Sequence, residues 1–296
     1  MQGLQSAIGT ALHDYKRAQF VASLPTGDTL DERGIRISAI GQCTPEAAAW
    51  VMAHPLNPRC KMTNAALTEA VRKRILLPIP QVTSGSLCCS CAAPLDSFGT
   101  HATCCSGINK SNQHKQIQEA AFKCIRPAAA FLTRVPAVID FFPKKPEPAG
   151  TPVDNTRSMA DIGITLNNTI AGAVTLVDYT VVAAVKGAPA AYPTAGTVAN
   201  NVEQSKVKQY NARYAIPPGR IIGFGIETSG AFGPAAKRLL WAATTACGGS
   251  PDLIARRYRR FIEEISVALQ VATFSNHRRF LTLCVKPTPG AGVAGG

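Results

Sequence analysis

Hydrophobic and polar residues follow two spacings along the chain, a helical one near the N-terminus and a β-type one in the middle. In the first 80 residues the pattern is helical, and Thr44-Pro45-Glu46 and Thr63 are typical of residues that begin helices. Over residues 160–185, β-branched residues cluster on either side of an Asn- and Gly-rich turn. This clustering predicts two β-strands.

Further segments extend this order toward the C-terminus. A third strand is predicted over 220–230. Helices are predicted over 109–132, 203–214, 233–247 and 251–281. Such an order favours an α/β (α+β) fold in which helices flank a mixed sheet.

The same pattern divides the chain into four parts. We expect a helical linker region over 1–80, a cysteine-rich segment with the helix after it over 81–125, the sheet domain over 126–286 and a disordered tail over 287–296.

Composition and charge narrow the class of protein. The chain has 296 residues, of which 46% are hydrophobic and 17% charged, and this balance argues against wholesale disorder. Its net charge of +13 makes polyanions the expected partners, nucleic acid first and an anionic membrane surface second. No uncharged apolar run approaches the ~18 residues that a membrane helix needs, so we expect a soluble protein.

Cysteines are concentrated in one short segment. Five of the ten fall between Cys88 and Cys105, and no cleavable signal peptide is recognisable, so we expect reduced cysteines in an intracellular protein. Cys88-x2-Cys91 followed by His101-x3-Cys105 has the spacing of four ligands that close on one zinc ion. A site filled by four protein ligands is structural.

Two alternatives stay open for this segment. The neighbouring cysteines, Cys89 and Cys104, could each replace an adjacent ligand. The cysteines could also be small buried residues without a metal.

Two aspartates lie at the ends of the predicted hairpin. A turn between Thr169 and Ile170 sets Asp161 opposite Asp178, with Cβ atoms about 5 Å apart. Opposed carboxylates repel unless a cation lies between them, and Mg²⁺ prefers such oxygen ligands. The alternative is that Asp161 caps a strand and Asp178 belongs to an unrelated salt bridge.

A hydrolytic site also needs a cation that neutralises the transition state. Thr180 stands where an Asp-x-Lys motif would carry its lysine, so the candidates are Lys206 and Lys208 in the following helix. Glu203, one helical turn before Lys206, could reach the same face. A solvated basic helix face is the alternative.

Four arginines in the last predicted helix are candidates for phosphate contacts, because basic side chains release counterions when they bind nucleic acid. An ordinary exposed helix face explains them equally well. They are Arg256, Arg257, Arg259 and Arg260.

The order of these motifs resembles a known family over about residues 35–285. The motifs are Cys88 and Cys91 before Gly99–Cys105, Asn112-Gln113-His114, Ala160-Asp161-Ile162, Val177–Val181, Glu203-x2-Lys206 with Tyr210, and Glu227-Thr228-x-Gly230. Together they resemble the C-terminal region of non-LTR retrotransposon reverse-transcriptase polyproteins. That region carries a zinc knuckle and a restriction-like endonuclease of the PD-(D/E)XK type.

The resemblance implies a nuclear protein that nicks DNA, so that the exposed 3′ end primes reverse transcription. It implies magnesium or manganese on Asp161 and Asp178, Lys206 or Lys208 as the catalytic lysine, and His114 beside the site. RNA is a further partner to consider. The chain departs from the family at Ala160, where a proline is expected, and at Gln113, where an arginine is expected. The alternative is therefore a catalytically inactive, zinc-stabilised module for nucleic-acid binding or assembly.

Overall fold

The structure is a computed structural model that describes residues 11–12, 15–27, 29–79, 82–105, 111–146, 158–168, 173–184 and 194–284. The predicted tail over 287–296 and the turn between Thr169 and Ile170 lie outside these residues. None of the described helices is both long and apolar enough to cross a membrane.

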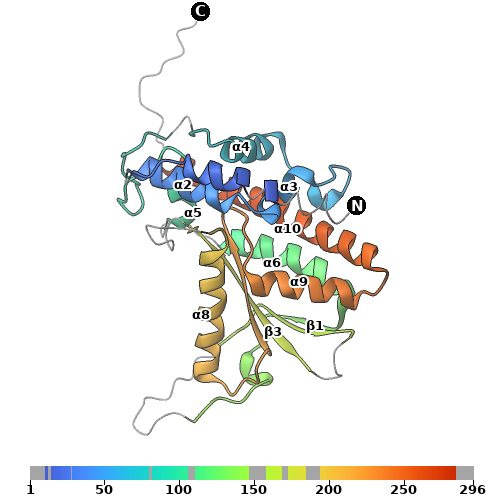
Figure 1. The fold of residues 1–296 in the computed structure, drawn as a ribbon. Helices are drawn as coiled ribbons and strands as arrows, with labels where there is room; N and C mark the ends of the chain where they lie inside the picture. The colour runs from blue at the N-terminus through green and yellow to red at the C-terminus, as the bar shows by residue number, and fades with distance from the viewer. Residues whose placement is uncertain are drawn as a thin grey trace, which may run out of the picture.

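A mixed four-stranded sheet forms the centre of the molecule (Figure 1). Its strands are β1 (Ala129–Arg134), β2 (Ile162–Leu166), β3 (Thr175–Val182) and β4 (Ile221–Glu227), in that spatial order. β1, β2 and β3 pair antiparallel, whereas β4 runs parallel to β3. The parallel pair requires a crossover, which α8 (Thr197–Arg213) provides. The mixed sheet and its three predicted strands are confirmed.

The first strand was not predicted. The helix expected over 109–132 ends early, because α6 (Ser111–Ile125) gives way to a short 3-10 turn that contains Pro127. Proline has no N–H to donate and interrupts a helix. The next residues pair with β2 as β1 and satisfy their backbone groups there. Pairing with a neighbouring strand thus overrides the helical preference of the alanines at 128–130.

Helices cover both faces of the sheet. α6 and α9 (Pro234–Ala246) pack on one face, and α10 (Pro251–Cys284) packs on both of these helices. α8 packs on the opposite face (Figure 1). Side chains of a strand alternate between faces, so Val177 and Tyr179 enter the large core under α6 and α9. Asp178, between them, faces α8.

Glycines let α8 lie directly on β4. A Cβ atom at Gly223 would come within 2.6 Å of the Glu203 Cα, and one at Gly225 within 2.5 Å of the Ala199 carbonyl oxygen. Only glycine fits such an approach, which explains the alternation of glycine and large apolar residues in β4.

The N-terminal helices form a layer on α10. They are α2 (Leu30–Gly41), α3 (Pro45–Met52) and α4 (Asn64–Arg74). Thr44 and Thr63 cap α3 and α4, since their hydroxyl oxygens accept from the backbone amides of Ala47 and Ala66, each three residues on. Trp50, Ala70 and Val267 share one apolar cluster, so the long C-terminal helix joins this layer to the sheet domain.

Candidate active site and metal centre

An open cavity of about 660 Å³ lies between the N-terminal end of α6 and α8. His114 of α6, Asp161 before β2, Asp178 in β3 and Lys206 of α8 all line it. The described pairing of β2 and β3, in which Ile162 lies opposite Val177, agrees with the register expected from the sequence. Residues from four separate stretches of chain therefore meet in one place.

The Asp161 carboxylate is held at the end of the strand pair. Its Oδ2 accepts from the Tyr179 backbone N–H at 2.6 Å, and its Oδ1 lies 3.1 Å from His114 Nε2. Gln118 of α6 donates to the Asp161 carbonyl oxygen at 3.2 Å. Asp161 thus caps the strand end, as the alternative interpretation expects, and also lines the cavity.

Asp178 is 6% exposed and carries a dense set of contacts. Its Oδ2 accepts from the Tyr210 hydroxyl at 2.6 Å and lies 3.2 Å from Lys206 Nζ. Burial raises the pKa of Asp178, although the bonds from Tyr210 and Lys206 oppose the rise. Its Oδ1 accepts no hydrogen bond from the described residues, which leaves one oxygen able to bind a cation.

Tyr210 is the site residue that reasoning from the sequence did not assign. Its hydroxyl contacts both Asp178 Oδ2 and, at 2.8 Å, the Met159 carbonyl oxygen. The available signal was its spacing: Tyr210 follows Lys206 by four positions, so both side chains lie on one helix face.

His114 is expected to titrate above the ordinary histidine value of 6.5. The hydrogen bond to Asp161 raises its pKa and outweighs the opposing effect of burial. The stabilisation from the protonated pair is therefore complete below about pH 6.5 and is lost as the pH rises through the higher folded-state pKa.

We expect Asp161→Asn to lower the His114 pKa, as an NMR titration of the imidazole would measure. The signal of exposed His54 is the internal control, and an unchanged His114 titration would contradict the pairing.

Glu203 and Lys208 do not belong to this cavity, so their assignment to it was wrong. Each residue of an α-helix is rotated by about 100° from the one before, so Lys208 projects almost opposite to Lys206. It lines a different groove, beside β4. Glu203 is 3% exposed, and its carboxylate accepts from the backbone N–H groups of Gly225, Ala235 and Ala236. It joins α8 to β4 and to the N-terminus of α9.

Replacing Glu203 with alanine should therefore destabilise the fold. Three buried amides would lose their acceptor, and we expect a loss of about 3 kcal/mol in the free energy of unfolding. Urea unfolding followed by circular dichroism measures it. Gln204→Ala, one residue along on the exposed side of α8, is the matched control and should change stability little. Equal effects of the two substitutions would contradict this role.

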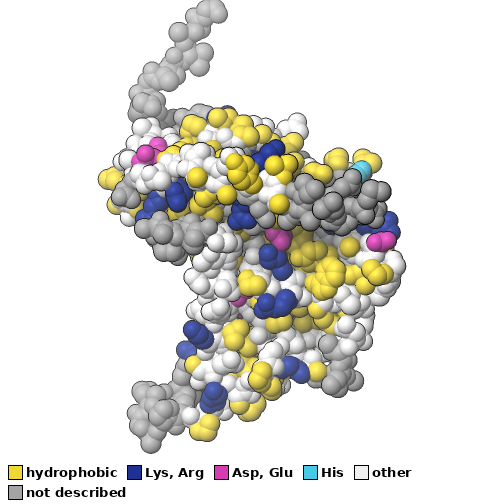
Figure 2. Space-filling view, in the orientation of Figure 1, with side chains coloured by type: hydrophobic (Ala, Val, Ile, Leu, Met, Phe, Trp, Pro, Cys, Tyr) yellow, Lys and Arg dark blue, Asp and Glu magenta, His cyan; other side chains and the backbone are white. Residues whose placement is uncertain are grey.

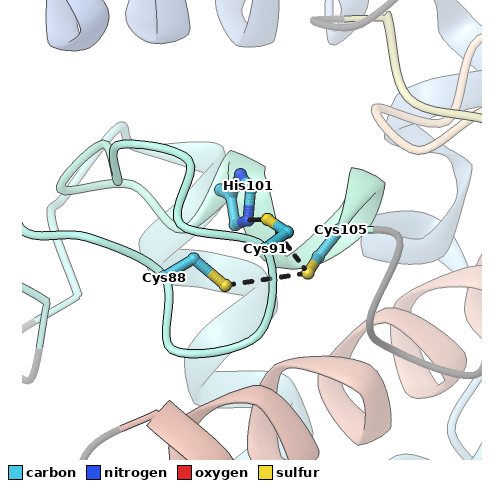
Figure 3. A group of neighbouring side chains, drawn as sticks. All are labelled: Cys88, Cys91, His101 and Cys105. Carbon is cyan, nitrogen blue, oxygen red and sulfur yellow. Dashed lines mark hydrogen bonds between the residues drawn. The ribbon is translucent and has the colours of Figure 1, made fainter.

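The predicted zinc ligands converge. The ligand atoms of Cys88, Cys91, His101 and Cys105 all lie within 4.8 Å of one another (Figure 3). Cys88 Sγ and Cys91 Sγ are each 3.7 Å from Cys105 Sγ, and Cys91 Sγ is 3.3 Å from His101 Nε2. A tetrahedral zinc ion with Zn–S bonds of about 2.3 Å requires S···S separations of about 3.8 Å. The four residues could therefore hold a metal such as zinc.

The surroundings of this Cys₃His cluster favour the thiolate that a metal needs. Burial raises the pKa of Cys88, but hydrogen bonds from the Ser90 and Cys91 backbone and from the His101 and Cys105 side chains lower it to about 6. Cys89 lies outside the cluster, with its thiol directed to the Leu283 carbonyl oxygen. The Cys104 side chain is not among the described ones. Within the described residues, this is the one group of three or more His, Cys, Asp or Glu side chains close enough to bind a common ion.

A carboxylate and an aromatic ring hold the cluster in place. Asp96 accepts from the backbone N–H groups of Thr100 and His101 and so orients α5 (Thr100–Cys104), which carries the histidine. Phe280 of α10 packs beside the His101 ring, with centroids 5.9 Å apart. The Cys₃His cluster is thereby attached to the same long helix that supports α6.

The four arginines of α10 divide into two pairs. Arg257 donates to the Thr244 and Gly248 carbonyl oxygens after α9, and Arg260 pairs with Glu264 at 2.9 Å. Arg256 and Arg259 are exposed. Two of the four thus have structural contacts, and two are available to a partner.

Comparison with known proteins adds no assignment at this point: no protein-family model, curated protein or solved structure matches the chain.

Proposed function

We propose that the chain is a metal-dependent DNA endonuclease that nicks one strand by phosphodiester hydrolysis. The observation that carries this proposal is the shared cavity of Asp161, Asp178, Lys206 and His114. The mixed sheet with helices on both faces supports the restriction-endonuclease-like fold that the motif order implies. A retroelement origin and a nuclear location belong to the same proposal.

The donor set of the cavity fits magnesium or manganese. Two carboxylates from neighbouring strands supply the hard oxygen ligands that these ions prefer, and Asp178 Oδ1 is not engaged by another described residue. A bound divalent ion would activate water and neutralise charge on the phosphate. Lys206, 31% exposed and directed into the cavity, would place a second positive charge beside the same phosphate. His114 would hold or release a proton beside Asp161.

A basic groove beside α6 supports DNA as the substrate. It runs between α6, α10 and residues 58–61. Its acidic residues, Glu119 and Glu264, are each already paired with two cations. Lys61 and Lys115 form no salt bridge within the described part of the chain, so the groove keeps surplus positive charge. Lys115 directly follows His114, so phosphates bound there would lie on the side of α6 next to the cavity.

Supercoiled plasmid provides the test. With Mg²⁺ or Mn²⁺, the purified protein should convert supercoiled plasmid to open circle, and chelation of the ion with EDTA should stop the reaction. Binding without open-circle product in either metal would contradict the endonuclease.

A second candidate is a zinc-stabilised nucleic-acid-binding or assembly module without catalysis. The observation in its favour is Gln113, which is 2% exposed and bonded to Thr273 and Asn276 of α10. It therefore brings no charge to the cavity at the position where the family has an arginine. Retention of DNA binding in the double variant Asp161→Asn, Asp178→Asn, together with no cleavage by the wild-type protein, would favour this module.

A further inference from the structure

A second groove lies on the side of α8 that faces away from the proposed nuclease cavity. Its volume is about 650 Å³, and it follows β4 between α8 and α9. Lys208 lines it, together with Arg238 of α9. On the surface between these two helices, hydrophobic and basic side chains lie side by side (Figure 2). The proposed nuclease function uses none of these residues.

The floor of the groove includes a free strand edge. β4 is the last strand of the sheet, so one of its sides has no neighbouring strand. Toward its C-terminal end that side is covered: the Gly225 N–H donates to Glu203, and the Gly225 carbonyl oxygen accepts from Gly233. Backbone groups of a strand alternate in direction, so those of Ile221 and Gly223 point the same way as those of Gly225.

Within the described residues, no group outside the β3–β4 ladder bonds to the backbone of Ile221 or Gly223. Unpaired groups at a sheet edge are a template for another strand. Both residues are buried, with Ile221 5% exposed, but they line the groove, so an extended peptide that enters it would meet these backbone groups.

The side chains around this edge determine which side chains of a peptide the groove favours. The walls are apolar and include Ile222, Leu239 and Val207. Lys208 and Arg238 form no salt bridge within the described part of the chain. The acidic residue of the groove is Glu203, whose carboxylate accepts hydrogen bonds from three backbone amides. Neither cation is ion-paired to a described residue, although Arg238 also attracts the Glu203 carboxylate. Two exposed cations beside an apolar floor favour a peptide with apolar side chains next to carboxylates.

The same lining argues against nucleic acid as the occupant. Proteins that bind single strands stack the bases on aromatic side chains, and none of the described residues that line this groove is aromatic.

We propose that this groove binds an extended acidic peptide of a partner protein, which adds a strand to β4. Its backbone pairs with Ile221 and Gly223, alternate apolar side chains lie over Ile222 and Leu239, and its carboxylates meet Lys208 and Arg238. This is recognition by strand addition, in which the backbone supplies affinity and alternate side chains supply selectivity.

The test uses two fluorescein-labelled heptapeptides, one of alternating isoleucine and glutamate and one with lysine in place of glutamate. Fluorescence anisotropy at physiological salt should give at least tenfold tighter binding of the acidic peptide. The double variant Lys208→Glu, Arg238→Glu should weaken that binding at least tenfold. Arg256→Glu, Arg259→Glu is the matched control with the same change of charge, and it should leave binding within about twofold.

A second measurement separates strand addition from attraction by overall charge. The amides of Ile221 and Gly223 should become protected from hydrogen exchange when the acidic peptide binds. Equal binding of both peptides, an equal loss in both double variants, or unprotected amides in the complex would each overturn the proposal. In another outcome, a single-stranded oligonucleotide displaces the acidic peptide and abolishes the protection of these amides. That result would assign the groove to nucleic acid instead.

Discussion

Replacing Cys105 with serine should release the metal of the Cys₃His cluster and unfold the segment around it. The wild-type protein should carry about one zinc per chain, and the variant a small fraction of that, as elemental analysis after gel filtration would measure. Because the free energy of zinc binding is also folding free energy, we expect the variant to lose on the order of 5 kcal/mol of stability. Urea unfolding of both proteins measures this loss.

Cys89→Ser is the matched control for this prediction. It makes the same chemical change in the same cysteine-rich segment, but Cys89 is exposed and its thiol lies outside the cluster. It should keep both the zinc and the stability of the wild type. Equal zinc content in the Cys105 and Cys89 variants would contradict the four-ligand site.

The consequences of zinc loss should extend beyond the loop. Cys88 and Cys105 share an apolar cluster with Phe280 of α10. One turn earlier, Asn276 of the same helix donates to Gln113, which precedes His114. Release of the C-terminal half of α10 would therefore remove a support of the α6 end that lines the nuclease cavity.

Local sequence signals were enough for the parts of the fold that depend on neighbouring residues. Thr44 and Thr63 cap helices because their hydroxyls meet amides only a few positions away. The spacing of Cys88, Cys91, His101 and Cys105 identified the cluster that the structure brings together. The register of β2 and β3 also follows the one expected from the sequence, since Ile162 lies opposite Val177.

Positions that depend on how helices lie on the sheet were not predictable in this way. The residue types of α8 do not reveal which of its faces meets β4, and this rotation decides that Lys206 enters the cavity while Lys208 leaves it. The assignment of Glu203 failed for a related reason: its partners, Ala235 and Ala236, lie more than thirty positions away. The strand β1 was missed because its pairing with β2, not its alanine-rich sequence, decides its conformation.

Asp178→Asn should separate DNA binding from DNA cleavage. The substitution keeps the size of the side chain and an oxygen that can accept from Tyr210, but it removes the charge that a divalent ion requires. We expect the rate of plasmid nicking to fall on the order of 10²–10³-fold. Binding of the same plasmid should not weaken, because the cavity loses a negative charge beside the phosphates.

Asp252→Asn is the control for this change, since it removes the charge of an exposed carboxylate in the first turn of α10. Its nicking rate should equal that of the wild type.

Burial raises the pKa of Asp178, and an ion binds the deprotonated carboxylate, so wild-type cleavage should increase as the pH rises through that pKa. Undiminished nicking by Asp178→Asn would show that hydrolysis does not depend on this carboxylate. The paired aspartates would then serve the fold, as an ion pair with Lys206 and a strand cap, and the binding module would be the better assignment.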